Sequence, residues 1–415
     1  MRIGFISTRL NGTDGVSLEV EKWAAVLSRL GHELCYCAGE LGGYAAGGTL
    51  IPQLHFAHPA IAALNERAFG VTTPAEAPAQ LLADIRATAA ELREPLREFV
   101  RRQQIDLLIV ENAFAIPMNL PLPLALTDLI GELDLKTIAH NHDFYWERQR
   151  YQNNAILELL DTVFPPNLPT VRHATINSIA QRRFKRRRGV DSVVVPNVHD
   201  FATPPPEVDP YAADLRAALG LSEADVFILQ PTRVIQRKGI ELALELVHCL
   251  DRPGRRLFIT HSASDEGLAY WQWLQHEATM LGVDLRLVDD LIGPERAERD
   301  GRKVYSLWDA YPHADLVTYL SLVEGFGNAL LEAIYFKRPV VVNRYAVYNA
   351  DIGPLGFEFI ELDGFVDDAA VAAVKALLAD PARVQAIVEK NYALAEAHFS
   401  YGVLERKLAK VIEGF

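Results

Sequence analysis

Short apolar strands alternate with helices along this chain, stop near its middle and then resume, and this alternation constrains the fold more than any other feature. Arg2–Ser7 and Ile105–Val110 are apolar runs that predict buried strands. Val16–Leu30 carries apolar residues at helical spacing, and a long polar helix is expected over about 75–104. Further strands are predicted at Glu33–Ala38, Lys136–Ala139, Ala174–Ile176 and Ser192–Val195. Such alternation is typical of a parallel sheet with helices on both faces.

The break falls at Ala202–Pro210, which has four prolines in nine residues and is predicted to be a linker. The pattern of strands and helices then restarts. Strands are predicted at Phe227–Gln230, Arg256–Thr260, Asp284–Val288, Leu316–Leu320 and Pro339–Asn343. Helices are predicted at Gly239–Leu250, Glu266–Leu281, Tyr305–Tyr311, Asn328–Phe336 and Asp368–Leu378. The restart predicts two α/β domains of the doubly wound, Rossmann-like type facing a central cleft, the first over residues 1–200 and the second over residues 211–399.

The overall balance of charge argues against one broad class of function. The chain has 41 Lys and Arg against 54 Asp and Glu, a formal net charge of −13, whereas nucleic-acid-binding proteins carry a basic footprint. Three cysteines provide no disulfide framework, and no apolar run is long enough to span a membrane. The sequence therefore predicts a cytoplasmic enzyme without a nucleic-acid partner, and it leaves the oligomeric state open.

The segment Leu320–Ala333 (LSLVEGFGNALLEA) predicts an anion-binding turn between a strand and a helix. Gly325 and Gly327 flank Phe326, and glycines allow the backbone to come close to a ligand. Asn328 is expected to cap the helix that follows. The unpaired amides of the first helical turn and the helix dipole favour an anion, so a phosphate group fits there.

Two carboxylates, Glu324 and Glu332, stand on either side of that turn with seven residues between them. Glu324 precedes the turn, from where it could reach a sugar hydroxyl. Glu332 lies about one turn inside the helix, from where it could accept hydrogen bonds from a ribose. The alternative is an ordinary strand–turn–helix connection with solvated carboxylates.

A second signal lies in the segment Gln230–Glu241 (QPTRVIQRKGIE). Arg233 and Lys238 follow the end of a predicted strand, and ligands of such sheets bind outside the carboxyl ends of the strands. Two cations there would neutralise a diphosphate, Arg233 as a bidentate fork and Lys238 as a point charge. Arg237 is interpreted as a solvated neighbour. Because these cations can replace a metal and no D-x-D pair accompanies the motifs, we expect no metal and no cofactor besides the substrate nucleotide.

Together, LVEGFGNALLEA and PTRVIQRKG resemble the retaining glycosyltransferases of family four, which have the GT-B fold. The similarity continues through RLGHEL, VVVPNVHDF and ADLVTYLS and so covers nearly the whole chain. The resemblance implies that Arg233 and Lys238 hold the donor diphosphate. It further implies that Glu324 contacts the donor sugar and that Glu332 contacts the ribose, with the GFG turn and Asn328 against the donor.

The same resemblance implies a histidine that contacts the donor sugar beside the reacting carbon. His140 and His142 both follow a strand in TIAHNHD, and His142 is preferred because His-Asp follows the strand in many such enzymes. Asp143 could orient the imidazole or bind the acceptor. Gly15, at the start of the first helix, would lie against the diphosphate, although the family usually has two adjacent glycines there.

The resemblance thus implies a retaining, metal-independent hexosyltransferase. Its donor would be a nucleotide diphosphate sugar of the UDP-glucose or GDP-mannose type, and its acceptor a hydroxyl of a small soluble molecule. One alternative is a GT-B phosphorylase or epimerase that uses the same pocket. Another is a catalytically inactive nucleotide-binding partner subunit, against which the complete set of Glu324, Glu332, Arg233 and Lys238 argues.

Two further segments carry predictions. The basic run Arg182–Arg188 (RRFKRRR) could hold an anionic membrane surface or a phosphorylated acceptor, or it could be the solvated end of a helix. Residues 403–414 form an apolar stripe at helical spacing, which must be buried somewhere. In the fold that the chain resembles, the end of the chain, here 400–415, crosses back to the first domain.

Overall fold

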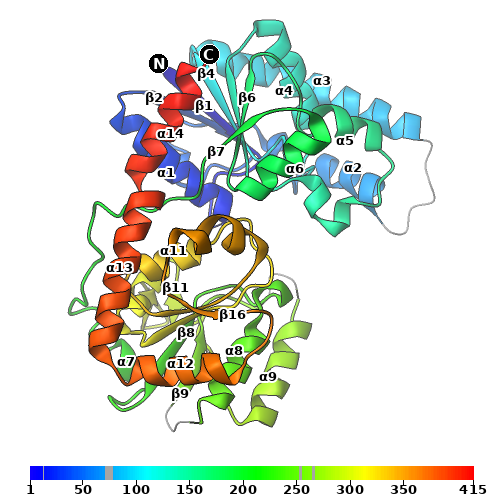
Figure 1. Ribbon diagram of the computed structural model, residues 1–415. Helices are drawn as coiled ribbons and strands as arrows, with labels where there is room; N and C mark the ends of the chain where they lie inside the picture. The colour runs from blue at the N-terminus through cyan, green and yellow to red at the C-terminus, as the bar shows by residue number, and fades with distance from the viewer. Residues whose placement is uncertain (13, 71–77, 252–254, 264–266) are drawn as a thin grey trace. The chain divides into compact units, whose positions relative to one another are not determined.

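The computed structural model describes residues 1–12, 14–70, 78–251, 255–263 and 267–415, and these divide into two compact units. The first unit combines Met1–Asn197 with Tyr401–Phe415, and the second is Val198–Ser400. Each unit is built on its own parallel sheet (Figure 1). Thr13 of the first loop, residues 75–77 of the predicted long helix and Glu266 of a later one lie outside the described residues.

The first unit contains a seven-stranded sheet in the order β3-β2-β1-β4-β5-β6-β7, with every neighbouring pair parallel. Its strands are β1 (Arg2–Ser7), β2 (Glu33–Ala38), β3 (Thr49–Leu50), β4 (Leu107–Glu111), β5 (Thr137–Asn141), β6 (Val171–Thr175) and β7 (Ser192–Val194). Its helices are α1 (Gly15–Arg29), α2 (Pro59–Phe69), α3 (Pro78–Arg102), α4 (Pro121–Leu133), α5 (Leu157–Val163), α6 (Ser178–Arg188) and α14 (Tyr401–Glu413). The central strands β4 and β5 are buried along their whole length, as expected for a parallel sheet covered on both faces.

The second unit contains a six-stranded parallel sheet in the order β10-β9-β8-β14-β15-β16. Its strands are β8 (Val226–Gln230), β9 (Arg255–Ile259), β10 (Asp284–Leu287), β14 (Leu316–Tyr319), β15 (Val340–Asn343) and β16 (Ile360–Leu362). Its helices are α7 (Leu215–Ala218), α8 (Ile240–Cys249), α9 (Ala269–Leu281), α10 (Leu307–Ala310), α11 (Asn328–Tyr335), α12 (Asp368–Leu378) and α13 (Pro381–Phe399).

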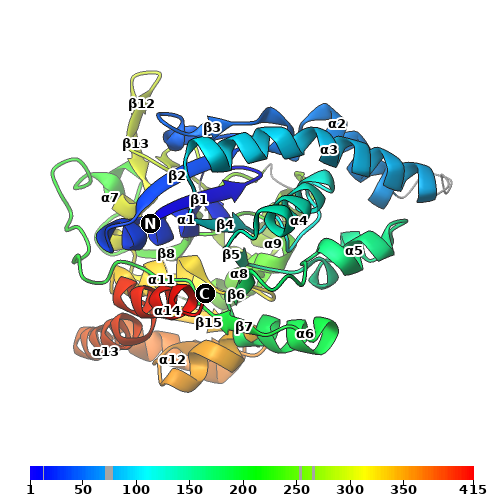
Figure 2. The ribbon, with the colours of Figure 1, turned by 90° about the horizontal axis from the view of Figure 1, so that it is seen from above.

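A small three-stranded sheet, β11 (Ile292–Gly293), β13 (Arg302–Ser306) and β12 (Ala297–Arg299), interrupts the second unit between β10 and α10. Figure 2 shows the β12–β13 hairpin standing out from the larger sheet of this unit. The predicted helix over Tyr305–Tyr311 is therefore wrong at its start. Tyr305 and Ser306 end β13, and α10 begins at Leu307 because the Ser306 hydroxyl and the Asp309 carboxylate cap its first turn reciprocally.

The last helix, α14, packs along α1 in the first unit (Figure 1). Its apolar stripe is buried through Val403, Leu404, Leu408 and Val411. Two cation–π contacts flank it, with the Arg29 guanidinium 5.1 Å from the Tyr401 ring and that of Arg172 4.7 Å from the Phe415 ring. Among the described residues, no helix combines the length and apolar character that crossing a bilayer requires.

Candidate active site

In the second unit, two loops meet outside the carboxyl ends of β8 and β14. These central strands mark the point where the strand order reverses, since β9 lies beyond β8 and β15 beyond β14. Gly239, in the loop after β8, adopts φ +59° and lies so close to the carbonyl oxygen of Leu320 that a Cβ atom would collide with it. Glycine thus lets the loop that carries Lys238 approach the loop that carries Glu324, at the edge where ligands of such sheets bind.

Glu324 is the centre of a buried ion-pair cluster. The Lys238 ammonium is paired with Glu324 Oε1, and the Arg237 guanidinium donates to Glu324 Oε2 at 3.1 Å. The side chains of Lys238 and Glu324 are only 11% and 10% exposed, whereas that of Arg237 is 39% exposed. The prediction that Arg237 is merely a solvated neighbour is therefore wrong, because it supplies the second cation that balances this carboxylate.

The surroundings of this cluster keep both signs of charge in place. Burial by itself would raise the pKa of Glu324, but the charges of Lys238 and Arg237 outweigh it and hold the pKa below its ordinary value. Burial lowers the pKa of Lys238, and the neighbouring charges of Arg237 and Arg233 lower it further, against the raising effect of Glu324. Arg233 is exposed in the same loop, so two cations reach this edge of the sheet beside Lys238.

The GFG turn and the start of α11 lie beside this cluster. Gly327 takes the cap position with φ +145°, and a Cβ atom there would be 2.8 Å from the Tyr345 hydroxyl. Tyr345 donates to the carbonyl oxygen of Phe326 at 2.5 Å. The prediction that Asn328 caps the helix is wrong, because Asn328 is the first helical residue and, in the described part of the chain, no side chain is hydrogen-bonded at the cap. The amides of Leu330 and Leu331 both bond back to the Gly327 carbonyl oxygen at 3.1 Å, so the described contacts that close the start of α11 come from the backbone.

Glu332 lies inside α11 and is held by a buried tyrosine. Its Oε2 accepts a hydrogen bond from the Tyr311 hydroxyl at 2.9 Å, and the Tyr311 ring stacks on Phe336 with centroids 4.9 Å apart. Burial raises the pKa of Tyr311 well above its ordinary value, so the phenol stays protonated and donates.

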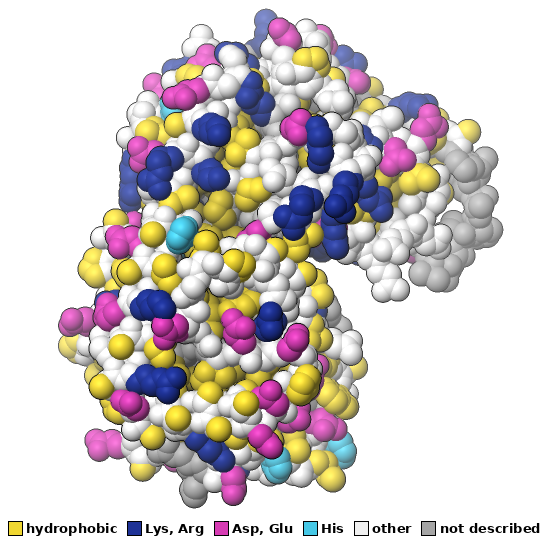
Figure 3. All heavy atoms as spheres, in the orientation of Figure 1, with side chains coloured by type: hydrophobic (Ala, Val, Ile, Leu, Met, Phe, Trp, Pro, Cys, Tyr) yellow, Lys and Arg dark blue, Asp and Glu magenta, His cyan; other side chains and the backbone are white. Residues whose placement is uncertain are grey.

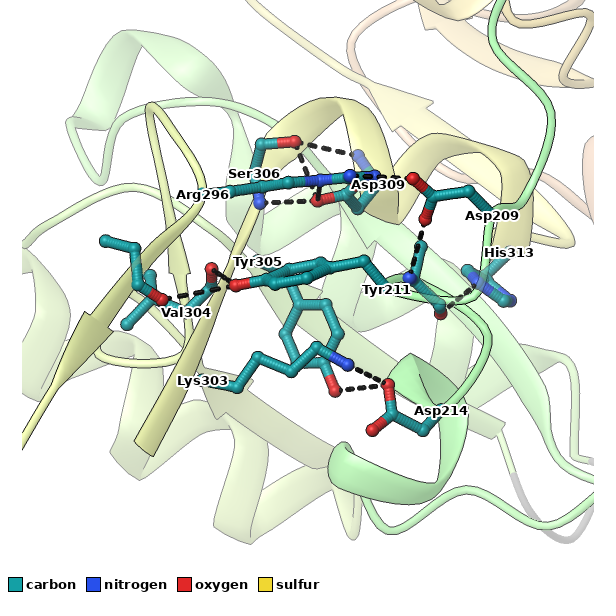
Figure 4. Close-up of polar contacts among 12 residues, drawn as sticks. Asp209, Tyr211, Asp214, Arg296, Lys303, Val304, Tyr305, Ser306, Asp309 and His313 are labelled. Carbon is teal, nitrogen blue, oxygen red and sulfur yellow. Dashed lines mark hydrogen bonds and ion pairs between the residues drawn. The ribbon is translucent and has the colours of Figure 1, made fainter. Parts of the chain in front are cut away.

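The segment that delivers Tyr311 is tied down by the polar network drawn in Figure 4. Arg296 bonds both carboxylate oxygens of Asp309 through Nε, at 3.1 and 3.0 Å, and also pairs with Asp209 at 2.7 Å. On the far side of Tyr311, a ring nitrogen of His313 is 2.9 Å from the Ala212 carbonyl oxygen. The small sheet and the segment around 209–214 therefore fix α10 and the turn that follows it.

In the first unit, both candidate histidines lie against one buried carboxyl group. Glu111 ends β4 and is paired in register with His140 of the adjacent strand β5. Its Oε2 is 2.9 Å from His140 Nδ1 and 3.5 Å from His142 Nε2, and the two imidazole centroids are 4.3 Å apart. All three side chains are at least nine-tenths buried. The rings share a face because residues two apart in a strand point the same way.

The residue after Glu111 holds the rest of the HNHD segment. Asn112, with φ +54°, accepts a hydrogen bond from the His142 backbone amide at 3.0 Å and donates to Asp143 Oδ1 at 3.3 Å. Asp143 is also paired with the Arg148 guanidinium. Asp143 is thus bonded to a neighbouring loop and to Asn112, and no contact of the described structure joins it to the His142 ring.

Burial governs the protonation of this cluster. It lowers the pKa of His140 to about 3, so that imidazole is neutral at physiological pH. Burial also lowers the pKa of His142, and it raises the pKa of Glu111, where His142 only partly opposes it.

Helix α1 covers the other side of the histidines. Trp23 stacks on His140 with centroids 4.1 Å apart, and Glu19, fully buried, pairs with Lys22 at 2.6 Å. Gly15 is the first residue of α1, and Asp14 caps the helix by accepting from the amides of residues 16 and 17.

The basic run Arg182–Arg188 forms the second half of α6. Figure 3 shows Lys and Arg side chains gathered over this helix. Several are engaged locally: Arg183 pairs with Glu147 at 3.2 Å, Lys185 pairs with Asp191 at 2.7 Å, and Arg187 lies 5.2 Å from the Trp146 ring centroid. These contacts match the interpretation of the run as a helix end that faces solvent.

Four residues of these clusters escaped the sequence analysis, or were undervalued by it: Glu111, Asn112, Arg237 and Tyr311. A carboxylate at the end of a buried strand was the available signal for Glu111, because a charge there needs a partner. Nothing in the local sequence of Tyr311 indicates that it contacts Glu332.

The two parallel-sheet units have the architecture of the GT-B fold, and solved structures share it. A glycosyltransferase from Rickettsia africae superposes with a TM-score of 0.67 at 14% identity, covering 100% of this chain and 98% of that one. Anabaena Alr3699/HepE, solved in complex with UDP-glucose, gives a TM-score of 0.65 at 14% identity with complete coverage of both chains. WaaG, a glycosyltransferase of lipopolysaccharide biosynthesis, gives 0.63 at 15% identity.

Sequence relatives define the family more narrowly, although no protein-family model matches the chain. A mannosylglucosylglycerate synthase of Thermotoga maritima is 34% identical over 443 aligned positions, which cover 99% of this chain and 100% of that protein. A protein of the same description from Petrotoga mobilis is 33% identical over 382 positions, 87% of this chain. The chain therefore belongs to the glycosyltransferase family that contains the mannosylglucosylglycerate synthases, and the predicted resemblance to family-four enzymes is confirmed.

Proposed function

We propose that this protein transfers a mannosyl group from a nucleotide diphosphate mannose to a hydroxyl of a glucosylglycerate, with retention of the anomeric configuration. The observation that carries the proposal is the 34% identity with a mannosylglucosylglycerate synthase along 99% of the chain. A product of that description places mannose on a glucosylglycerate, so of the two expected donor types the proposal selects GDP-mannose. The acceptor is then small and bears a carboxylate.

The second unit supplies the electrostatics for departure of the diphosphate. Cleavage of the sugar–phosphate bond builds negative charge on the leaving group, and preorganised cations stabilise such charge. Lys238 and Arg233 stand at the carboxyl edge of β8, and the positive end of the α11 helix dipole favours the same kind of ligand. An ammonium group has three donors, so Lys238 can bond Glu324 and a phosphate oxygen together.

Glu324 and Glu332 bind the two hydroxyl-bearing parts of the donor in this proposal. The lowered pKa of Glu324 keeps it ionised, and an ionised carboxylate is a strong acceptor for the hydroxyls of the transferred sugar. Glu332, oriented by the hydrogen bond from Tyr311, is assigned to the ribose. Gly325 and Phe326 form the turn between these two groups.

The first unit contributes groups for the sugar and the acceptor. His142 is 8% exposed and is the histidine of the pair that a ligand reaches more easily, since His140 is 1% exposed and lies under Trp23. We assign the donor-sugar contact to His142 and the acceptor contact to Asp143. Gly15, at the capped start of α1, is assigned to the diphosphate. The retaining step then proceeds on one face of the sugar, because no carboxylate is assigned as a nucleophile.

A donor and acceptor panel tests this function. The purified protein is incubated with GDP-mannose or UDP-glucose and with glucosylglycerate, glycerate or no acceptor, and released nucleotide and product are quantified. We expect turnover with GDP-mannose and glucosylglycerate, and the one-bond carbon–hydrogen coupling at the new anomeric centre should report an α-mannoside. A β-mannoside would refute retention, and turnover only with phosphate or without an acceptor would favour a phosphorylase or an epimerase.

Chelation tests the proposed independence from metals. With the diphosphate neutralised by side-chain cations, activity should persist in excess EDTA. Loss of activity that added magnesium or manganese restores would place a metal ion at the diphosphate instead.

A further inference from the structure

The clearest unexplained feature outside the diphosphate edge is the buried group formed by Glu111, His140 and His142. Four polar atoms here lack a hydrogen-bonding partner in the described structure: Glu111 Oε1, His140 Nε2, His142 Nε2 and Glu19 Oε2. Buried polar atoms are usually satisfied, so such a concentration marks a functional arrangement.

We propose that Glu111 is a positioning residue that fixes the tautomers of both histidines, so that His142 presents an unprotonated Nδ1 to a substrate hydroxyl. The proposal rests on the proposed function, because it takes His142 as the histidine that contacts the sugar. Glu111 itself touches no substrate in this scheme. It acts through the two imidazole rings.

The distances support one proton arrangement. The 2.9 Å between His140 Nδ1 and Glu111 Oε2 is a direct hydrogen bond, and a neutral His140 can satisfy it only by carrying its proton on Nδ1 when the carboxyl is ionised. The nitrogen of His142 nearest to the same oxygen is Nε2, at 3.5 Å. A proton on that nitrogen points at the carboxylate and leaves Nδ1 as the lone-pair acceptor.

The backbone reinforces this orientation. Asn112, the residue after β4, accepts from the His142 amide, and Glu111, the last residue of β4, lies 3.5 Å from the His142 ring. On the neighbouring strand, Asn141 Nδ2 donates to the carbonyl oxygens of Ala139 and Ala174 at 3.0 and 3.1 Å. His142 is the first residue after β5, so its backbone leaves a strand that these bonds hold in place, as a precise contact with substrate requires.

Other charged groups face the cluster and set the background of its titration. They are Glu19 and Lys22 from α1, Tyr44 from the segment after β2, and Asp143 after β5. The nearby Glu111 carboxylate raises the pKa of His142, against the larger lowering effect of burial. Removal of that charge should therefore lower the pKa of His142, which gives the proposal a signed readout.

The same three side chains are a two-histidine, one-carboxylate set that could hold a metal ion. We favour the proton arrangement because the 2.9 Å between His140 Nδ1 and Glu111 Oε2 is the length of a direct hydrogen bond. A bound metal is therefore the main competing outcome, and it is measured directly in the experiment.

The experiment compares wild type with Glu111→Gln. Glutamine keeps the shape of the side chain, but it has no charge and only one oxygen that can accept hydrogen bonds from the two imidazole rings. Nitrogen–proton correlation spectra of the histidine rings report their tautomers, and His173, a buried histidine on β6 whose Nε2 is 3.1 Å from the Pro166 carbonyl oxygen, is the internal control. We expect the His140 or His142 tautomer to change in the variant while the His173 signals stay in place.

Kinetics and metal analysis complete the test. In Glu111→Gln, kcat should fall roughly 10- to 100-fold, the scale of one well-placed proton-handling group, with a smaller change in donor KM. The acid limb of the pH profile should move to lower pH, which a merely structural role would not cause. Unchanged tautomers and an unmoved acid limb would overturn the proposal, as would a stoichiometric metal ion in the wild type that the variant loses. If no donor and acceptor pair gives turnover, the spectra still test the role of Glu111 separately from the proposed function.

Discussion

Glu111 in the first unit and Glu324 in the second occupy equivalent places in their sheets, yet their pKa values are shifted in opposite directions. Each follows or ends a central strand beside the point where the strand order reverses, and each is almost fully buried. Burial raises the pKa of Glu111, and the neighbouring His142 only partly opposes it. Burial acts on Glu324 as well, but Lys238 and Arg237 outweigh it and lower the pKa.

The difference shows that the partner, rather than the depth of burial, decides in which direction the pKa of a buried carboxyl group moves. A buried imidazole loses its own charge, as the pKa of about 3 for His140 shows, so it cannot compensate a carboxylate. An ammonium and a guanidinium keep theirs. On the proposed function, the second unit therefore offers fixed charges to the diphosphate, and the first offers neutral imidazole groups to sugar hydroxyls.

The largest expected effect is loss of the buried cation of the second unit. Lys238→Ala should reduce kcat by a factor on the order of a hundred or more, since one preorganised donor to a developing charge is removed. Arg233→Ala should have an effect of the same order. Arg237→Ala is the matched control, because Arg237 contacts the same carboxylate but is 39% exposed and lies in the better-solvated position.

Steady-state kinetics at saturating donor and acceptor measure this order, with thermal unfolding to confirm that each variant is folded. Near-wild-type kcat in both Lys238→Ala and Arg233→Ala would remove the basis for assigning the diphosphate to this edge. An Arg237→Ala defect as large as that of Lys238→Ala would show that the ion-pair cluster acts as a whole.

Much of the cluster around Glu324 in the second unit could be predicted from the sequence, because each of its residues lies close to a recognisable local motif. Lys238 and Glu324 each lie within a few residues of a strand end, and parallel strands bring their carboxyl ends to one edge. The glycines of the GFG turn predict an unusual backbone conformation, since only glycine readily adopts the φ of +145° at Gly327. That same conformation displaced the predicted cap from Asn328 to Gly327.

The cluster of Glu111, His140 and His142 in the first unit was only partly predictable, because it depends on the pairing of strands that are distant in the sequence. His140 and His142 were recognisable as a pair, but the register that sets Glu111 opposite His140 joins residues 29 apart in sequence. The small sheet was missed for a different reason. Its strand β12 is exposed at every residue, so it lacks the apolar alternation that marks a strand.

The next effect in size concerns the stability of the fold as a function of pH. The folded pKa of Glu324 lies below its unfolded value, so its ionised form stabilises the fold above the unfolded value, and this contribution is lost as the pH falls through the folded pKa. The advantage of wild type over Glu324→Gln in free energy of unfolding should thus shrink on acidification from about pH 6 to about pH 3.

Glu111 should show the opposite slope. Its folded pKa is raised, so ionisation costs stability as the pH rises from the unfolded value through the folded one. Glu111→Gln should therefore gain on wild type as the pH rises over the same range. Urea unfolding of wild type, Glu324→Gln and Glu111→Gln at a series of pH values measures how each free-energy difference changes with pH. Parallel changes in the two variants would contradict the opposite pKa shifts of the two carboxyl groups.

The smallest effect is expected for removal of the neutral Tyr311 hydroxyl, which donates to the Glu332 carboxylate in the second unit. Tyr311→Phe removes the 2.9 Å hydrogen bond to Glu332 but keeps the ring that stacks on Phe336. One such bond contributes about 0.5–1.5 kcal/mol, so the donor KM should rise by a few-fold while kcat changes little, because Glu332 is assigned to the ribose and not to the reacting carbon.

Tyr305→Phe is the matched control, since it deletes a comparable 2.8 Å bond to Asp214 in the same part of the unit without touching Glu332 (Figure 4). Donor KM and the affinity for free nucleoside diphosphate, measured by calorimetry, should be altered in Tyr311→Phe and not in Tyr305→Phe. Equal changes in the two variants would mean that the polar network acts only through the stability of the small sheet. A change in Tyr311→Phe alone would show that a neutral hydrogen bond orients Glu332, while ion pairs orient Glu324 eight residues earlier.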